Sequence, residues 1–278
     1  MRIKVNLTAP KLPILYRHRF MAMIKEALEN SDATYKRSLY PDKGPERSKI
    51  VKPFCFNVSM PPGRRAERER IVIDEGVEIE DTVFYFPQNS YLSFYLSSSD
   101  YEFMIHLYNG LLELKTFRFN SDIIFNLHRV FMLNEKRINN EEVTFKTNAP
   151  ILIEDKEGKP IIPIDSVTPI EPSNFQPLAL SLKPFNGHFN AIHDRIIRDI
   201  RDGQGLYREI EFIPVKLKKQ VVKHTLKGFR EKTGKPYMTL TCFEGCFKLK
   251  GDPRDLQMLY QIGIGLRTGQ GFGMVEVV

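Results

Sequence analysis

The chain ends in the stretch Gly263-Ile264-Gly265-Leu266-Arg267-Thr268-Gly269-Gln270-Gly271-Phe272-Gly273-Met274-Val275-Glu276-Val277-Val278. Five of its 17 glycines lie between residues 263 and 273. Glycine suits positions where φ is positive or where another backbone comes close, so this segment predicts a loop shaped for a ligand with an extended backbone. The apolar run that follows predicts a closing strand, and Arg267 and Thr268 indicate a ligand that carries phosphate. We expect this ligand to contact Gly263, Gly265, Arg267, Thr268, Gly269, Gly271 and Gly273.

Two other phosphate-binding loops fit this segment less well. The glycines of a Rossmann site lie at a strand-to-helix turn early in a βαβ unit, whereas this segment follows an expected helix and precedes a strand. A P-loop needs Gly-Lys-Ser or Gly-Lys-Thr at the start of a helix, and the chain lacks both sequences. A flexible turn without a ligand stays as the plainer alternative.

Length, composition and charge indicate a globular protein with an acidic partner. The 278 residues suit two domains of ordinary size, and 42% are apolar. The sequence contains no apolar run of about 18 residues and no signal peptide, so we expect a cytoplasmic protein that does not enter membranes. The formal net charge of +7 favours nucleic acid as the partner.

The positive charge is concentrated between residues 216 and 235, where Glu231 is the one acidic residue. The basic residues of this segment are Lys216, Lys218, Lys219, Lys223, Lys227, Arg230, Lys232 and Lys235. The segment predicts a long basic hairpin or loop that contacts phosphates, above all through Lys216, Lys218, Lys219, Lys223, Lys227 and Arg230. The arginines of residues 61–70 alternate with Glu67 and Glu69, so we expect a solvated loop there.

The cysteines do not indicate a disulfide framework or a metal site. There are three, an odd number. Cys242 and Cys246 have a spacing that could suit zinc, but a zinc site takes four ligands and no second pair lies nearby in the sequence. We therefore expect small buried strand residues and no bound metal.

Hydrophobic periodicity predicts the same order of elements twice. In the first half we expect a strand at 2–7, a helix at 17–29, a loop at 33–52, strands at 54–60 and 71–97, a helix at 99–113 and strand residues at 114–133. In the second half we expect strands at 143–153 and 160–164, a helix at 186–201, strands at 207–226 and 236–250, a helix from Asp252-Pro253, and a strand at 272–278. The fold class is therefore α+β, with two tandem ferredoxin-like β-α-β-β-α-β domains at 1–140 and 141–278.

Two details of this pattern matter later. Tyr101, Met104, Ile105, Tyr108 and Leu112 recur at helical spacing and predict the apolar face of the helix at 99–113. The alternation of the 236–250 strand slips at Glu244-Gly245, which indicates either a bulge or a tight hairpin.

Two such domains with a glycine-rich segment before the last strand resemble the CRISPR repeat-processing endoribonucleases, the sixth Cas family of the RAMP superfamily. The signature is Gly263-x-Gly265 followed by Gly271-Phe272-Gly273 and the apolar Met274-Val275. Residues 103–165, with their Gly158-Lys159-Pro160 turn, fall in family order.

This resemblance implies RNA cleavage without metal or cofactor. A ribose 2′-OH attacks the adjacent phosphate and leaves a 2′,3′-cyclic phosphate and a 5′-OH. The implied partners are CRISPR repeat RNA, as precursor and as processed guide, and a CRISPR effector complex, with the protein a monomer or a weak homodimer.

The resemblance also implies where the acid–base groups lie, namely on the helix at 17–29 and in the loop after it, commonly with a histidine. This chain has no histidine between residues 30 and 60. Alignment puts Arg37 at the histidine position and Lys25 at a helix position often held by tyrosine. The candidates are Lys25, Tyr35, Lys36, Arg37, Tyr40, Lys43 and Arg47. Tyr and Lys ordinarily titrate near ~10 and ~10.4, so neighbouring positive charges would have to lower their pKa values before either served as a base.

His18 is a further catalytic candidate, because it shares a helix face with Lys25. The two lie about 10 Å apart along the axis, so a structural or RNA-contacting role is preferred for His18. Three functions stay open: an endoribonuclease, a repeat-binding protein that cuts weakly or not at all, and a structural effector subunit that binds guide RNA. The glycine-rich segment disfavours the third, because it has the form seen in the processing family.

Overall fold

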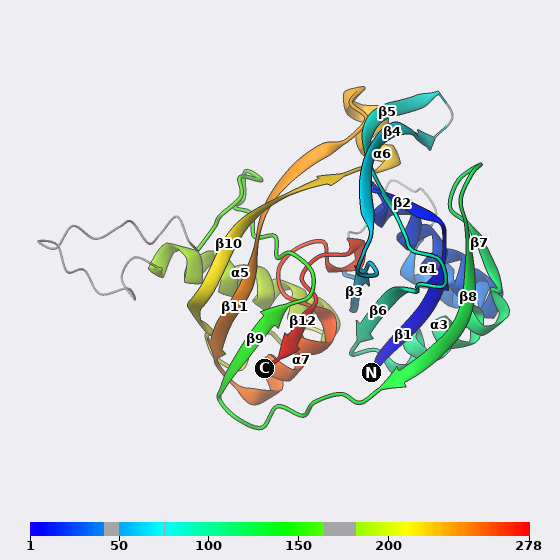
Figure 1. Ribbon diagram of the computed structural model, residues 1–278. Coiled ribbons are helices and arrows are strands. Elements are labelled where there is room, and N and C mark those ends of the chain that lie inside the picture. The colour runs from blue at the N-terminus through cyan, green and yellow to red at the C-terminus, as the bar shows by residue number, and fades with distance from the viewer. Residues whose placement is uncertain (42–49, 75, 164–181) are drawn as a thin grey trace, which may run out of the picture. The chain divides into compact units, whose positions relative to one another are not determined.

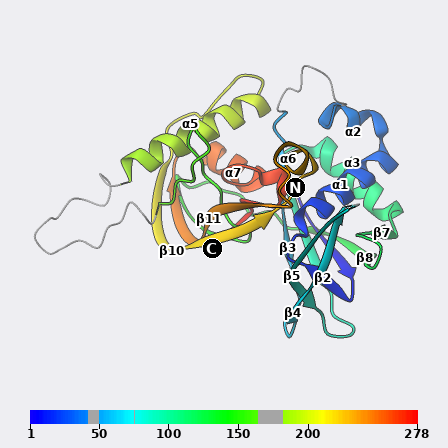
Figure 2. The same cartoon turned by 90° about the horizontal axis from the view of Figure 1, so that it is seen from above.

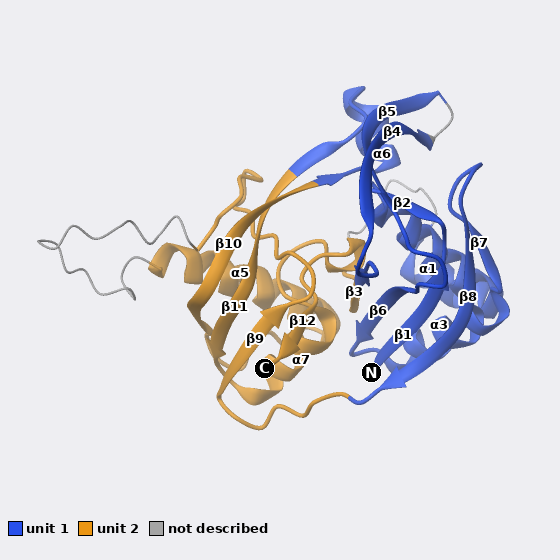
Figure 3. Cartoon of the chain, viewed as in Figure 1, with its two compact units in different colours: residues 1–50, 57–134, 223–239 blue, residues 51–56, 135–222, 240–278 orange. Residues whose placement is uncertain are grey.

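The computed structural model describes residues 1–41, 50–74, 76–163 and 182–278. The chain forms two compact units (Figure 3). Unit 1 contains residues 1–50, 57–134 and 223–239, and unit 2 contains residues 51–56, 135–222 and 240–278. The predicted domain boundary at residue 140 stays a prediction. Within the described part of the chain, no helix is long and apolar enough to span a membrane.

The first half of the chain has the ferredoxin-like order that the sequence predicts. Its core elements are β1 (Arg2–Thr8), α1 (Arg17–Ser31), β3 (Phe54–Ser59), β6 (Leu92–Ser98), α3 (Tyr101–Glu113) and β8 (Ile124–Leu133). The short strand β7 (Thr116–Arg118) extends the sheet, whose spatial order is β3-β6-β1-β8-β7. The central strand β1 pairs antiparallel with both β6 and β8, so that Val5 lies between Phe94 and Val130.

Helices α1 and α3 pack against each other through a glycine. A Cβ atom on Gly110 of α3 would lie 1.7 Å from the carbonyl oxygen of Ala27 on α1. This close approach buries Phe103, Leu107 and Leu111 of α3, together with Gly110. The predicted apolar face of this helix is therefore wrong in part: Met104 is buried, whereas Tyr101, Ile105 and Leu112 are exposed.

A short helix, α2 (Ala33–Leu39), lies where the sequence predicts a loop over 33–52. The Asp32 carboxylate caps it by accepting hydrogen bonds from the amides of Thr34 and Tyr35, each at 2.8 Å. Such a cap satisfies the first amides of a helix and stabilises even a short one. The predicted loop over 33–52 is thus wrong for 33–39, and residues 42–49 lie outside the described part of the chain.

The arginine-rich segment predicted as a loop is mostly strand. β2 (Lys11–Pro13), β4 (Arg65–Asp74) and β5 (Val77–Tyr85) form a sheet in the order β2-β5-β4. Arg68 faces Glu80 with Nε and Oε1 3.6 Å apart, and Arg70 bonds to Glu78 across the same pair of strands. Arg68 and Arg70 therefore form cross-strand ion pairs that offset part of the positive charge of this segment.

The second half of the chain repeats the ferredoxin-like order. Its elements are β9 (Glu142–Thr147), α5 (Lys183–Ile200), β10 (Glu211–His224), β11 (Met238–Lys250), α7 (Pro253–Ile262) and β12 (Val275–Val277). The sheet order β10-β11-β9-β12 matches that of the first sheet element by element. Helices α5 and α7 lie on one face of this sheet (Figures 1 and 2). They bury a core that includes Phe185, Phe189, Phe212, Phe243, Phe247 and Tyr260.

The predicted basic hairpin is present, but its tip is helical. Strands β10 and β11 are neighbours in the sheet, and the short helix α6 (Lys227–Thr233) lies between them in the chain. β11 continues through Gly245, so the hairpin alternative at that position is wrong. Gly245 has φ +135, and a Cβ there would lie 2.0 Å from the carbonyl oxygen of Lys216. The slip in alternation therefore marks a close approach of two backbones.

Candidate functional site

The five glycines of the closing segment are all buried. A Cβ on Gly273 would lie 2.1 Å from the carbonyl oxygen of Ile264, and one on Gly265 would lie 2.5 Å from that of Leu152. Both glycines have positive φ, +71 and +86 respectively. These positions need glycine because backbones pass each other inside unit 2, and this need is independent of any ligand.

The accessible part of the segment is the short run from Arg267 to Gln270. Arg267 has φ +60, and Thr268–Gln270 forms one turn of 3-10 helix, called η1. The side chains of Arg267, Thr268 and Gln270 are half-buried, whereas Gly269 packs against Lys52. A ligand of this segment would therefore meet Arg267, Thr268 and Gln270 before it met a glycine.

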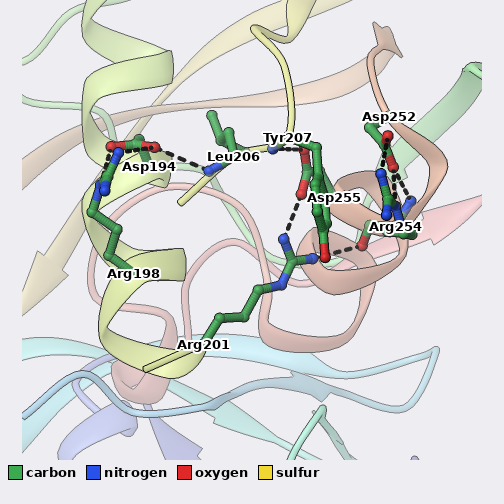
Figure 4. Close-up of polar contacts among 8 residues, drawn as sticks. All are labelled: Asp194, Arg198, Arg201, Leu206, Tyr207, Asp252, Arg254 and Asp255. Carbon is green, nitrogen blue, oxygen red and sulfur yellow. Dashed lines mark hydrogen bonds and ion pairs between the residues drawn. The ribbon is translucent and has the colours of Figure 1, made fainter. Parts of the chain in front are cut away.

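Helix α7, which leads into the segment, is fixed at its start by buried charge (Figure 4). Asp252 caps the helix by accepting the Arg254 amide at 2.9 Å. Asp255 is fully buried and accepts from Arg201 Nη1 at 2.7 Å and from the Tyr207 amide at 2.8 Å. A buried carboxylate is tolerated only with such partners, so α5 and the loop after it hold α7 in place.

In unit 1, the candidate catalytic groups Lys25 and Tyr40 lie together. Lys25 is on α1 and Tyr40 follows α2, with the Lys25 Nζ 4.7 Å from the centre of the Tyr40 ring. Burial, and secondarily the charge of Lys36, lowers the pKa of Lys25. Burial also raises the pKa of Tyr40. Helix α2 is what brings Tyr40 back to α1, and the sequence did not predict that helix.

The other candidates from this region are directed elsewhere. The Tyr35 hydroxyl donates to Asp100 at 2.9 Å, and its ring stacks on His106 with centroids 4.7 Å apart. Burial and this bond raise the pKa of Tyr35, so it has the character of a packing residue between α2 and α3. Lys36 pairs with Glu29 at 2.6 Å.

Arg37 and His18 have contacts with residues other than Lys25 and Tyr40. Arg37 is exposed and donates to Thr34 in its own helix at 3.3 Å. The ring of His18 lies edge-on to Phe119, 6.5 Å between centroids. Lys43 and Arg47 lie outside the described residues, so their predicted roles stay predictions.

The basic residues of β10 differ in how far their charge is neutralised. Lys218 pairs with Glu244 at 2.8 Å, and Lys223 pairs with Asp81 at 2.5 Å. Lys216 and Lys219 are exposed on the same strand. Successive side chains of a strand point to opposite faces, so Lys218 and Lys219 cannot follow the same line of phosphates.

The end of the basic hairpin borders a hollow in unit 1 of about 480 Å³. Its lining includes the cations Lys227, Arg230 and Lys235 and the carboxylates Glu78 and Glu231. Arg230 donates to the Thr225 hydroxyl at 3.0 Å, which fixes its direction. The hollow has three cations against two carboxylates, a modest positive excess.

Residues 133–277, more than half of the chain, match the family described as CRISPR associated protein Cas6, C-terminal. The chain belongs to the Cas6 family. The family resemblance predicted from the glycine-rich segment is thereby confirmed. No curated protein matches this Cas6-family sequence.

Solved structures of Cas6 and RAMP proteins share the fold over the whole chain. One is a Cas6-related protein from Pyrococcus furiosus, with a TM-score of 0.68, 18% identity, and coverage of 100% of this chain and 98% of that one. A second is a RAMP protein that binds different RNA substrates, with a TM-score of 0.67, 18% identity, and coverage of 100% and 99%. A third is a CRISPR associated protein Cas6, with a TM-score of 0.63, 19% identity, and coverage of 100% and 99%. The two ferredoxin-like units predicted from the sequence are therefore the architecture of these Cas6 and RAMP proteins.

One residue of this Cas6-family chain that the sequence did not single out is His193. It lies inside α5, not at its edge, and its Nε2 accepts the Gly265 amide at 2.8 Å. Burial lowers the pKa of His193 to about 4. Its spacing of four from Phe189 on the apolar face of the helix is the signal that could have indicated its burial.

The sequence predicts no bound metal ion, and this prediction depends on how the His, Cys, Asp and Glu side chains are arranged. Among the described residues, no three His, Cys, Asp or Glu side chains are arranged to hold a metal ion. Cys55 and Cys242 are buried, and Cys246 is half-buried.

Proposed function

We propose that this protein is a metal-independent endoribonuclease that binds CRISPR repeat RNA and cuts precursor transcripts into guide RNAs. The proposal rests on membership of the Cas6 family and on the pairing of Lys25 with Tyr40. The pairing carries it, because a lysine with a lowered pKa beside a tyrosine that keeps its proton supplies two different groups for proton transfer.

We assign Lys25 the role of the general base that activates the 2′-OH nucleophile. A lowered pKa increases its neutral fraction, so the amine can accept the proton of the 2′-OH. The 2′-oxygen then forms a bond to phosphorus as the bond between phosphorus and the 5′-oxygen breaks. The resulting Lys25 ammonium stabilises the negative charge that develops on the phosphate oxygens.

We assign Tyr40 the role of the proton donor for the leaving 5′-oxygen. Its raised pKa keeps the hydroxyl protonated at neutral pH, so it has a proton to donate there. A proton passed from this hydroxyl to the departing 5′-oxygen completes the products, and the phenolate then recovers a proton from solvent. The products are a 2′,3′-cyclic phosphate and a 5′-OH, as the family resemblance implies.

The RNA contacts that we propose follow the accessible cations. Arg267 and Thr268 would bind phosphate at the closing segment. Along the basic hairpin, Lys227 would bind it together with either Lys216 or Lys219, which point to opposite faces of β10. Lys218 and Lys223 are weaker candidates, because Glu244 and Asp81 already neutralise them. Each phosphate contact adds about one to the slope of log affinity against log salt, so the set predicts strongly salt-dependent binding.

Cleavage in EDTA tests the proposal directly. Cognate repeat RNA is incubated with the protein in EDTA, with and without a 2′-deoxy substitution at the scissile nucleotide. Cutting that the substitution abolishes supports the mechanism. Lys25→Ala should lower the cleavage rate about 10²-fold or more while RNA binding persists, and Lys115→Ala, which removes an exposed lysine outside the site, should not. An unchanged rate in Lys25→Ala would contradict the assignment of Lys25.

A second function, a repeat-binding protein that cuts weakly or not at all, is favoured by one observation. The chain has no histidine between residues 30 and 60, so no side chain there ordinarily titrates near neutral pH. Tight, repeat-specific binding without cleavage would support this function over the first. Equal binding to arbitrary RNA would instead support a structural effector subunit.

A further inference from the structure

His193 connects α5 to the glycine-rich segment by a pair of hydrogen bonds of fixed direction. Its Nδ1 lies 2.7 Å from the carbonyl oxygen of Phe189, and its Nε2 lies 2.8 Å from the amide nitrogen of Gly265. A carbonyl oxygen only accepts and an amide only donates. Both bonds therefore form only in the neutral tautomer that carries its proton on Nδ1.

The Gly265 amide has no simple substitute for this acceptor. Gly265 is buried, has φ +86, and is already so close to Leu152 that a Cβ would lie 2.5 Å from the Leu152 oxygen. His193 is itself completely buried. An amide left without an acceptor in such a place pulls the backbone toward another partner or toward water.

Three successive amides anchor the start of the segment to three different parts of unit 2. The Ile264 amide donates to the Gly273 oxygen at 2.8 Å, Gly265 donates to His193, and Leu266 donates to the Leu152 oxygen at 2.8 Å. Of these three, the bond to His193 is the one made by a side chain. The next residue is Arg267, where the accessible part of the segment begins.

We propose that His193 is a positioning residue for RNA binding, which holds the Gly265 amide so that Arg267, Thr268 and Gln270 keep the geometry that RNA contacts require. The inference rests on the proposed function for its ligand. It goes beyond that function in assigning the geometry of the closing segment to a buried side chain on another element. His193 touches no RNA in this scheme.

Two substitutions separate the two hydrogen bonds of His193. In His193→Asn the side-chain NH₂ takes the place of Nδ1, so the bond to Phe189 persists and the acceptor for Gly265 is lost. In His193→Gln the side-chain oxygen reaches the place of Nε2, so the acceptor persists and the bond to Phe189 is lost. Each variant loses one buried hydrogen bond, which makes the two a matched pair for stability.

The experiment measures the Kd for cognate repeat RNA and the amide hydrogen exchange of residues 263–274 in both variants. We expect His193→Asn to raise Kd about tenfold or more, the effect of one buried amide without its acceptor, and His193→Gln to stay within about threefold of the wild type. Exchange over 263–274 should rise in His193→Asn and stay near the wild-type rate in His193→Gln. His188→Asn, on the same helix but half-exposed, is the control and should change neither quantity.

The outcomes distinguish this inference from the proposed function. Equal Kd values in the two His193 variants, or unchanged exchange in His193→Asn, would overturn the positioning role while wild-type binding to repeat RNA still supported the proposed function. A wild type that binds no repeat RNA would overturn the proposed function, and with it the role of His193 toward RNA, whatever the exchange rates.

Discussion

Lowering the pH from 8 to 5 should reduce the free energy of unfolding by about 2 kcal/mol through His193 alone. The ordinary histidine pKa is 6.5, and burial lowers that of His193 to about 4. Between pH 6.5 and about 4, His193 therefore binds a proton in the unfolded chain but stays neutral in the folded chain. Stability is complete above pH 6.5 and falls as the pH drops toward 4. Because one pKa unit corresponds to about 1.4 kcal/mol, the total loss once both states are protonated is about 3 kcal/mol.

The physical basis is the same hydrogen-bonded arrangement that fixes the tautomer. Protonation of Nε2 would place a donor against the Gly265 amide, which is also a donor, 2.8 Å away. The charged ring would also lie fully buried beside Phe189, with ring centroids 4.1 Å apart. Both effects disfavour the imidazolium, and neither exists in the unfolded chain.

The assay has two parts. Histidine-labelled NMR titration of the six histidines gives the folded-state pKa of His193, whose signal is identified by its absence from His193→Gln. Urea unfolding at pH 8, 6.5 and 5 then gives the pH dependence for the wild type and for His193→Gln. Carboxylates titrate in both proteins, so their contribution cancels in the difference. A His193 signal that titrates near pH 6.5, or the same pH dependence in both proteins, would refute the reasoning.

Two further predictions concern backbone geometry. Gly110→Ala should destabilise the protein by several kcal/mol, because its Cβ would overlap the Ala27 oxygen. Gly187→Ala, on the exposed side of α5, meets no atom within 4 Å and should stabilise the protein by about 0.5–1 kcal/mol. Thermal unfolding compares the two variants, and an equal change in stability would show that α1 and α3 move apart to accept the Cβ. Arg267→Gly should remove the strain of a left-handed backbone and raise the free energy of unfolding by up to about 1 kcal/mol, while it weakens RNA binding. An unchanged Kd for RNA in this variant would show that Arg267 does not contact the RNA.

The order of the elements could be predicted from the sequence because each long element has a clear period. Helix α1 and helix α7 lie where apolar spacing and the Asp252-Pro253 start indicated them. The errors arose where a contact distant in sequence decides the local structure. The face of α3 is one example, since Tyr101 and Ile105 have the spacing of a buried stripe and Gly110 decides which stripe packs.

The candidate site was predictable in its residues but not in its pairings. Lys25 and Tyr40 were both candidates, yet only the capped helix α2 brings them together, and its cap is the single residue Asp32. The arginines of β4 looked like a charged loop, because the partners Glu78 and Glu80 lie on the next strand. Charge along a sequence therefore overstates the charge available to a ligand whenever a neighbouring strand supplies the opposite sign.

The closing segment combines two different requirements that its glycines alone do not reveal. Four of its residues with positive φ are glycines, at 263, 265, 271 and 273, and all four are buried. Arg267 also has positive φ, +60, where glycine would avoid a cost of roughly 1–2 kcal/mol. Since this segment uses glycine wherever the fold alone requires that conformation, an arginine at this one position makes structural sense only if its side chain has a task. The fold of the segment thus depends on its glycines and on His193, whereas the RNA contacts that we propose for it are concentrated at Arg267 and the turn that follows.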